Sequence, residues 1–396
     1  MNKRLLLTLC LGCGALGLAA QSDFRLTHGP YLQEVTTGKA TVVFQTSGKA
    51  FSWVEVKPHG APDGEAVRCY ATRDGQRMAN DTFHAIRLQG LKPAGTYDYR
   101  IVSKEMVDFQ PYKVVFGDSI TSDWHRFSTL DPARRGASIF ITSDMHSDAA
   151  KLDTLLQLAD YQTCDAFFYA GDMMSYIDNP ELPFTSFIDL SVERFASSIP
   201  FEVVRGNHET RGHLARSFSH YFPKENGKIY GAYRLGDLMI VMLDSGEDKS
   251  DAHPVYAGLN DFDGYRAEQA RWLEQLIESD DYKTARYHIV ISHFPMVMPE
   301  KDKAEGTWKG WEDAIRRFLP VLNKAGVDLL VAGHTHRYAY YEPGADGNGF
   351  PVLIQGFYSA VRLDVEDGKI ALKVVDTRGN ILKQETLAVS DGRRLQ

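Results

Sequence analysis

The chain has 396 residues and a formal net charge of −8, with 43% hydrophobic and 24% charged residues. This composition is typical of a folded globular protein and excludes a disordered chain. A net acidic chain without a run of like charges has no electrostatic basis for holding a polyphosphate backbone. We therefore expect no nucleic-acid partner and disfavour a nuclease. At about 100–200 residues per domain, the length predicts two domains or one large one.

The first twenty residues differ in composition from the rest of the chain. Two basic residues precede an apolar run from Leu5 to Leu18, and Ala19 and Ala20 follow it. This order is typical of a signal peptide, whereas a membrane span needs about 20 apolar residues. We assign residues 1–20 to a signal peptide and expect an exported protein, periplasmic or secreted, without a transmembrane segment.

Lipid attachment is the alternative for the N-terminus. Cys13 follows Leu11 and Gly12, which resembles a lipidation site. Cleavage before Cys13 would leave a shorter apolar stretch than signal peptides have, so we favour export over anchoring. Beyond the signal peptide only Cys69 and Cys164 remain, in different halves of the chain, and they predict no disulfide framework.

Residues 24–128 predict an all-β domain. Ala40–Thr46 and Phe51–Val56 alternate apolar and polar side chains, as half-buried strands do, and Phe83–Leu88 continues the pattern. A Leu-x-Pro turn then leads into a strand with Tyr97, which resembles the tyrosine corner of fibronectin type III-like sandwiches. We therefore expect such a sandwich at this end of the chain.

Residues 135–378 predict an α/β domain. Nearly continuous apolar segments alternate there with amphipathic ones, and continuous apolar segments are typical of strands buried on both faces. The predicted helices are Lys151–Tyr161, Arg266–Glu278 and Trp311–Ala325. The predicted strands are Ser138–Ser143, Ala166–Ala170, Phe201–Arg205, Leu238–Leu243, Tyr287–Ser292 and Leu329–Ala332. Asp367-Gly368 predicts a hairpin turn between two later strands, and residues 379–396 form a C-terminal tail.

Polar side chains follow five of the predicted strands at their carboxyl ends. In open α/β sheets the functional site lies beyond these ends, so we expect the side chains to meet. They are Asp144 and His146, Asp172, Asn207 and His208, His293, and His334 and His336. Carboxylate, amide and imidazole donors without a thiolate suit Fe, Mn or Zn. The donors exceed the number that one such ion takes, so the sequence predicts two transition-metal ions.

The same motifs resemble those of the calcineurin-like metallophosphoesterases. The resemblance covers roughly residues 137–376 and rests on Asp144-x-His146, Gly171-Asp172, Gly206-Asn207-His208-Glu209, His293 and Gly333-His334-x-His336, in that order. Gly29-Pro30-Tyr31-Leu32, near the start of the β domain, is similar to the N-terminal domain of purple acid phosphatases. The resemblance implies an α/β fold of mixed sheets flanked by helices and a metal-dependent hydrolase of small phosphate esters.

The resemblance also implies a role for each side chain. One metal would be held by Asp144, His146 and His336, the second by Asn207, His293 and His334, and Asp172 would bridge the two. Two ions about 3.5–4 Å apart can share one carboxylate, activate a hydroxide and clamp the phosphoryl oxygens. Asp172 is therefore a catalytic candidate, and His208 would assist the leaving group.

The sequence departs from the purple enzymes at one coordination position. Those enzymes have a Tyr three residues after the bridging Asp, and a Gly where this chain has His146. Here Ser175 stands at the Tyr position and Tyr176 comes one residue later. We therefore expect His146 to take that coordination position and Tyr176 to stay off the metals.

We expect an acid-phosphatase-like phosphomonoesterase. A phosphodiesterase of the same fold is an open alternative, because residues outside the motifs determine substrate shape. A catalytically silent binding protein that uses the β-sandwich is another. A silent scaffold need not retain His208 together with a full set of ligands, and this chain has both.

Overall fold

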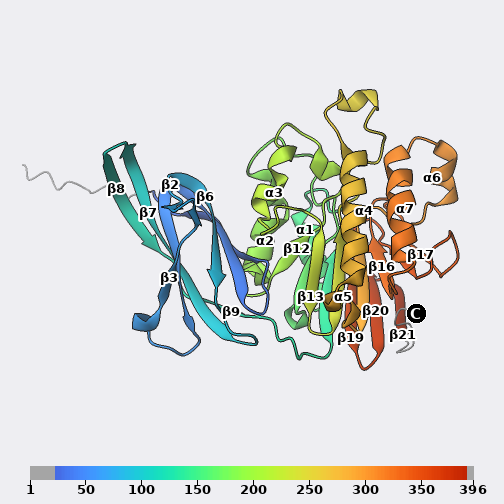
Figure 1. The fold of residues 1–396 in the computed structure, drawn as a ribbon, viewed down its shortest axis with the longest axis horizontal. Coiled ribbons are helices and arrows are strands. Elements are labelled where there is room, and N and C mark those ends of the chain that lie inside the picture. The colour runs from blue at the N-terminus through green and yellow to red at the C-terminus, as the bar shows by residue number, and fades with distance from the viewer. Residues whose placement is uncertain (1–22, 390–396) are drawn as a thin grey trace, which may run out of the picture.

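The computed structural model describes residues 23–389, which form an N-terminal β domain and an α/β domain joined by residues 129–136 (Figure 1). The predicted signal peptide, residues 1–20, and Cys13 lie outside the described residues. Between residues 23 and 389, no helix has both the length and the apolar character needed to span a membrane.

The N-terminal β domain is organised around one long strand. Its main sheet contains β1 (Leu26–Gln33), β2 (Lys39–Pro58), β3 (Val67–Cys69), β6 (Asp81–Gln89), β7 (Thr96–Gln110), β8 (Lys113–Thr121) and β9 (His125–Ser128). Two short strands, β4 (Thr72–Arg73) and β5 (Gln76–Arg77), form a separate hairpin. The first half of β2 pairs with β1 and β6, and the second half pairs with β3 and β7.

The two segments predicted as separate strands, Ala40–Thr46 and Phe51–Val56, belong to this single 20-residue strand. The Ser-Gly sequence between them does not turn the chain. It coincides instead with an irregularity in the register between Gln45 and Ala50, where β2 changes partners. A bulge of this kind bends a strand without ending it.

Tyr97 makes the contact predicted for a tyrosine corner. The Lys92 backbone N–H donates a hydrogen bond to Tyr97 Oη at 2.7 Å, and the Tyr97 ring stacks on Phe127. This hydrogen bond ties the turn to the strand that follows it. Assignment of the domain to the fibronectin type III-like class stays a prediction.

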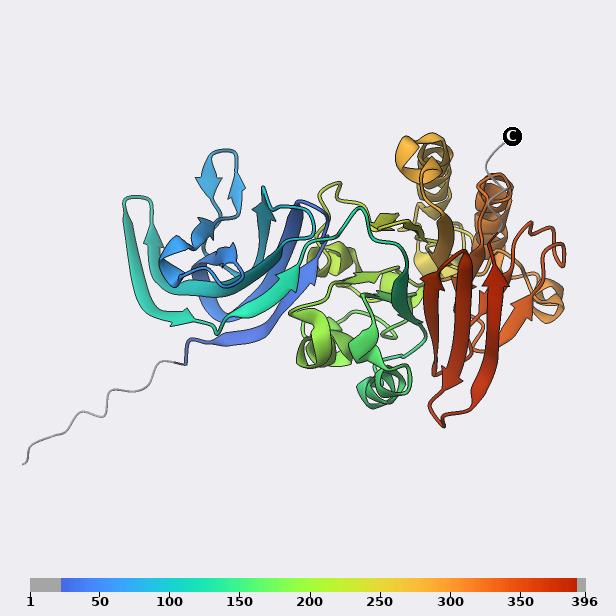
Figure 2. The same cartoon turned by 90° about the horizontal axis from the view of Figure 1, so that it is seen from below.

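The α/β domain consists of two six-stranded mixed sheets packed face to face, with helices on the outer sides (Figures 1 and 2). In spatial order the first sheet contains β12 (Phe201–Val203), β11 (Ala166–Tyr169), β10 (Ala137–Thr142), β19 (Ser359–Glu366), β20 (Lys369–Asp376) and β21 (Ile381–Ala388). The second contains β13 (Gly231–Leu235), β14 (Leu238–Leu243), β15 (Tyr287–Ser292), β16 (Leu329–Ala332), β18 (Val352–Ile354) and β17 (Ala339–Tyr341). The helices are α1 (Ala149–Leu158), α2 (Asp189–Ser191), α3 (Phe218–Tyr221), α4 (Phe262–Glu278), α5 (Asp280–Lys283), α6 (Glu300–Glu305) and α7 (Lys309–Leu322).

Three apolar clusters hold these layers together. The central cluster lies between the sheets and joins Ile139 and Phe168 of the first sheet to Ile289 of the second. A second cluster packs α1 and the helical turns around α2 against the outer face of the first sheet. The third packs α4 and α7 against the second sheet. Strands buried on both faces explain why their sequences are continuously apolar.

Most predicted elements of this domain occur within a few residues of the expected bounds. Asp367 and Gly368 have φ angles of 49° and 78° and connect β19 to β20 as the predicted hairpin turn. The segment set apart as a C-terminal tail contains β21, which pairs antiparallel with β20. β21 is a largely exposed edge strand, so it lacks the apolar run that marks the inner strands.

The two domains contact each other through β1. Tyr31, from Gly29-Pro30-Tyr31-Leu32, is fully buried and donates a hydrogen bond from Oη to the Tyr221 carbonyl at 2.6 Å. His28 lies between Glu181 and Asp189, with ring nitrogens 2.6 and 2.9 Å from their carboxylates. The contact between the domains therefore combines a buried aromatic side chain, Tyr31, with a group of polar side chains around His28.

Candidate metal centre

The carboxyl ends of five strands meet at one edge of the α/β domain. The loops that follow β10, β11, β12, β15 and β16 carry the predicted ligands. Backbone hydrogen bonds join the first two loops, because the Asp144 N–H donates to the Gly171 carbonyl and the His146 N–H to the Asp172 carbonyl, both at 3.0 Å. The register of the parallel strands thus places these side chains together.

Several of these ligands lie on unusual backbone. Asp144, His146, Asp172, His334 and His336 all have positive φ, between 45° and 74°. Left-handed non-glycine residues cost about 1–3 kcal/mol each and concentrate at functional sites, where the surrounding structure enforces them. The backbone of these loops therefore adopts unfavourable φ angles that place the side chains of the site.

Two glycines of the motifs allow the loops to approach closely. A Cβ on Gly206 would clash with the Asp172 carboxylate, and a Cβ on Gly333 would clash with Asp144. No other residue type fits at these two positions without displacing a ligand. This close packing explains why glycine precedes Asn207 and His334 in the motifs.

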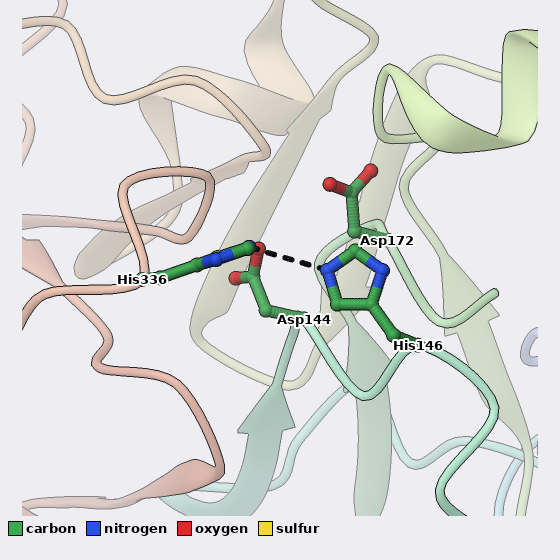
Figure 3. A group of neighbouring side chains, drawn as sticks. All are labelled: Asp144, His146, Asp172 and His336. Carbon is green, nitrogen blue, oxygen red and sulfur yellow. Dashed lines mark hydrogen bonds and ion pairs between the residues drawn. The ribbon is translucent and has the colours of Figure 1, made fainter. Parts of the chain in front are cut away.

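The first donor group consists of Asp144, His146 and His336, together with Asp172 (Figure 3). One ligand atom from each residue can be chosen so that all lie within 4.8 Å of one another. His336 Nε2 lies 3.2 Å from Asp144 Oδ1 and 3.2 Å from His146 Nε2. Two carboxylates and two imidazoles converging on one point are a suitable donor set for a transition-metal ion.

The second donor group consists of Asn207, His293 and His334, again with Asp172. Asn207 Oδ1 lies 3.1 Å from His293 Nε2 and 3.2 Å from His334 Nδ1. His293 Nε2 is also 3.1 Å from Asp172 Oδ2. The other oxygen of Asp172 accepts a hydrogen bond from the His208 backbone N–H at 3.0 Å. Asp172 is thus the member common to both groups.

The tautomer of His293 indicates that the second group fits a cation. His293 Nδ1 lies 2.9 Å from the Ala170 carbonyl, which can only accept, so Nδ1 carries a proton. In the neutral ring Nε2 then presents a lone pair toward two oxygens, an arrangement that needs a positive charge between them. Burial alone lowers the pKa of His293, but the charge of Asp172 outweighs burial and raises this pKa to about 10. A bound metal ion would supply the positive charge that these groups favour.

The pKa values of Asp172 and His334 are also shifted by the charges around them. Burial raises the pKa of Asp172, but the neighbouring His293 outweighs it and holds this pKa below its usual range. Burial and the nearby His293 lower the pKa of His334 to about 3, so His334 is neutral and can offer a lone pair. Ionised carboxylates and a neutral imidazole are the protonation states that metal binding requires.

Glu209 is a functional residue that the motif contained without an assigned role. It is fully buried, and its carboxylate accepts hydrogen bonds from the backbone N–H groups of Asp172, Gly206 and Met174 at 2.8, 2.8 and 3.2 Å. Burial and the charge of Asp172 raise the pKa of Glu209 to about 7. Glu209 therefore fastens the loop after β11 to the loop after β12 and orients the ligands on both.

Asp248 is a second residue that sequence reasoning missed. Asn207 Nδ2 donates to Asp248 Oδ2 at 3.4 Å, and this contact turns Asn207 Oδ1 toward the two histidines. Asp248 lies on the loop after β14, where no motif marks it. Only the packing of that loop against the site shows its contribution.

His208 borders the site without belonging to either donor group. Its Nδ1 donates to the Ser175 carbonyl at 2.9 Å, and its Nε2 accepts from Arg211 Nη1 at 3.0 Å. Arg211 is held by Glu247 at 3.3 Å. Arg205, the other arginine flanking this loop, pairs with the buried Asp244 at 2.9 Å instead. A fixed imidazole and a guanidinium thus stand side by side next to Asp172.

Phe357 forms an apolar part of the rim. Its side chain is 39% exposed, and its ring centroid lies 4.8 Å from that of His336 and 5.8 Å from that of His146. Tyr176 is 51% exposed. The side of the site at the first donor group is therefore open to solvent and partly apolar.

The fold and the donor groups match a known family of metallophosphoesterases. Residues 137–338 match the model of the calcineurin-like phosphoesterase family, and the chain belongs to that family. This confirms the predicted family and the predicted enzyme class.

Known relatives and structures agree with this class. The chain is 25% identical over 273 residues to purple acid phosphatase 21 of Arabidopsis thaliana, covering 66% of this chain and 53% of that protein. It is 23% identical over 269 residues to acid phosphatase type 7 of Mus musculus, covering 64% of this chain and 56% of that protein. The chain thus spans about half the length of these curated relatives.

The fold is similar to that of two solved structures. A purple acid phosphatase from yellow lupin seeds superposes with a TM-score of 0.68 at 16% identity, covering 92% of this chain and 74% of that one. The structure of PhoD superposes with a TM-score of 0.59 at 12% identity, covering 90% and 88%. At these identities the likeness concerns the fold, and it confirms the predicted mixed sheets flanked by helices.

Proposed function

We propose that this protein is an exported binuclear metallophosphoesterase that hydrolyses phosphate monoesters, in the manner of an acid phosphatase. The observation that carries the proposal is the pair of donor groups that share Asp172, each of which could hold one ion. When bound, the ions would lower the pKa of water and neutralise charge on the phosphoryl group. The phosphatase names of the relatives support the choice of phosphate esters as substrates.

The proposed metal ligands are the members of the two donor groups. Asp144, His146 and His336 would hold one ion, Asn207, His293 and His334 the other, and Asp172 would bridge them. Fe, Mn and Zn suit these oxygen and nitrogen donors. Asn207 contributes an oxygen without charge, so the centre keeps a net positive charge that attracts a phosphate dianion.

His208 is proposed to assist the leaving group. Because Nδ1–H is held by the Ser175 carbonyl, the ring presents Nε2 to the site. Once Nε2 is protonated and its contact with Arg211 is broken, it can donate a proton to the alkoxide as the ester bond breaks, and Arg211 can stabilise the developing negative charge. The two side chains would bind and neutralise the leaving oxygen together.

The decisive activity test is phosphate release from a panel of monoesters and diesters. Chelator-treated protein would be assayed alone and after addition of Mn²⁺, Zn²⁺ or Fe²⁺. We expect hydrolysis of monoesters that depends on added metal and is faster than hydrolysis of diesters. Absence of phosphate release from every ester with every metal would contradict the proposal, and faster diester hydrolysis would favour a phosphodiesterase.

Export and the nature of the β domain complete the proposal. Cleavage after Ala20 would start the mature chain at Gln21, and the N-terminal β domain would be a fibronectin type III-like cap similar to that of purple acid phosphatases. Mass spectrometry of protein recovered outside the cytoplasm should give the mass of residues 21–396. A diacylated N-terminus at Cys13 would instead show a lipoprotein.

A further inference from the structure

A groove of about 1160 Å³ lies between the two domains, and none of the described residues that we assign as metal ligands lines it. One wall is formed by β6, the adjoining part of β2 and residues 70–73 and 78–79 of the β domain. The other is formed by residues 180–181, α3 and residues 214–228 of the α/β domain. In Figure 1, β6 and α3 face each other from the two domains. The volume lies slightly above the upper end of the range of roughly 300–1,000 Å³ typical of small-molecule pockets, so the groove has room for a peptide segment.

The strand that lines this groove has an open edge. In the described part of the chain, β6 pairs with β2 alone, in unbroken register from Phe83 to Gln89. Successive residues of β6, such as Ala85 and Ile86, line the groove although their side chains lie on opposite faces, so the groove follows the edge of the strand as well as one face. An unpaired, regular edge presents a row of backbone N–H and C=O groups that can accept a further strand.

The edge strand β8 lacks this combination. Its pairing with β7 contains two irregularities, and it has no second wall. At β6, Phe83 contacts His220 of the α/β domain with ring centroids 4.0 Å apart, which closes the base of the groove. A strand added here would have β6 on one side and the α/β domain on the other.

The uncompensated charge of the groove is positive. Arg73 and Arg216 are exposed on its two sides, and within residues 23–389 neither has a carboxylate within ion-pair distance. Of the acidic residues in the lining, Glu181 pairs with His28, whereas Asp81 accepts hydrogen bonds from backbone N–H groups of β6 and keeps its negative charge, so that the two arginines outnumber it. On a chain of net charge −8, this local excess of positive charge favours an acidic ligand.

We propose that this groove binds an extended acidic polypeptide segment, which adds to the open edge of β6 as a further strand. Backbone hydrogen bonds would supply the affinity, and Arg73 and Arg216 would select acidic side chains. This binding is independent of the phosphoesterase reaction and would dock a partner protein beside the enzyme.

The test uses a defined probe, a fluorescein-labelled peptide of eight residues that alternates Glu and Val. Fluorescence anisotropy at low salt should show saturable binding to the full chain, weakened by added salt. Hydrogen exchange with peptide bound should slow at the amides of Phe83–Arg87. A Lys-Val peptide should not bind, and neither should a Glu-Val peptide that is N-methylated at alternate residues. Equal binding of the N-methylated peptide would show attraction by charge alone and would overturn strand addition.

Paired variants test the positive charges. The double variant Arg73→Glu with Arg216→Glu should bind the Glu-Val peptide with an affinity lower by about tenfold or more, while its hydrolysis of a small phosphate ester stays unchanged. The matched control, Arg135→Glu with Arg378→Glu, reverses two exposed charges outside the groove and should bind like the unmodified chain. Absence of binding by the unmodified chain, unchanged hydrogen exchange at β6, or equal affinity of the two double variants would each contradict the proposal.

Discussion

The two donor groups share Asp172 but differ in how firmly the protein holds them. In the first group His336 is 44% exposed, whereas His293 of the second group is 0% exposed. His293 is fixed through the Ala170 carbonyl and Asn207 through Asp248. The first group lies at the open, partly apolar rim beside Phe357. We therefore expect the second group to hold its ion more firmly, and the first group to be the side from which substrate reaches the proposed centre.

Removing the shared carboxylate charge should have the largest effect, because it acts on both groups. Asp172→Asn keeps the shape of the side chain but removes the charge that the two ions would share. Charge stabilisation by the ions contributes several kcal/mol, and 1.36 kcal/mol is tenfold, so we expect kcat/KM to fall by about 10³-fold or more. Metal content per chain should also fall. The exposed Asp74→Asn is the matched control, and a fully metallated, active Asp172→Asn protein would show that the groups do not share this ligand.

Changing His208 should separate chemistry from metal binding. His208→Ala should lower kcat by about 10²-fold, the lower end for a general acid, because Arg211 still stabilises the leaving oxygen. Metal content should not change, since His208 belongs to neither group. Assays with nitrophenyl phosphate and with alkyl phosphates check the role, because a good leaving group needs little protonation. An equal loss for both kinds of substrate would assign His208 another role.

The contrast between the groups can be tested with one histidine from each. His336→Ala should remove only the ion of the first group, leaving about one ion per chain and an activity about 10–100-fold lower. His293→Ala should remove the ion of the second group and also destabilise the metal-free fold by about 2–4 kcal/mol, because it leaves a cavity and an unsatisfied carbonyl. Elemental analysis and urea unfolding in the presence of chelator measure the two effects. Equal stability losses in the two variants would contradict the distinction.

The smallest effect is expected at Tyr176. A tyrosinate bound to Fe(III) gives purple phosphatases their visible absorption, which requires direct coordination. Here His146 is expected to occupy that coordination position, so the iron-loaded protein should lack an intense purple band. Tyr176→Phe should leave metal content and the visible spectrum nearly unchanged. A strong visible band that disappears in this variant would place Tyr176 among the ligands.

The sequence predicted which side chains meet at the site, but it did not predict the hydrogen bonds that hold them in place. Parallel strands bring their carboxyl ends to one edge, so residues such as Asp144 and His293, far apart in the chain, could be expected to meet. The bonds that fix them could not be predicted, because Glu209 holds three backbone N–H groups from two loops and Asp248 lies on a loop without a motif. The ion pair between Arg205 and Asp244 could not be predicted either, because it depends on how two loops pack together.

In the fold, too, features that depend on neighbouring residues in the sequence were predicted, and features that depend on contacts between distant segments were not. Strands buried on both faces have the predicted bounds because their sequences are apolar throughout, as in β14, or nearly so, as in β15. The continuity of β2 was missed, because a Ser-Gly sequence favours a turn unless neighbouring strands hold it extended. The groove beside β6 depends on how the two domains pack against each other. The alternation of apolar and polar residues within a strand carries no information about that packing.

The central claim is that two ions share Asp172, and anomalous diffraction from crystals of the metal-loaded protein tests it most directly. We expect two anomalous peaks about 3.5–4 Å apart, one beside Asp144, His146 and His336 and the other beside Asn207, His293 and His334. The Asp172 carboxylate should lie between them. A single peak in fully loaded crystals, or two peaks without Asp172 between them, would contradict the account.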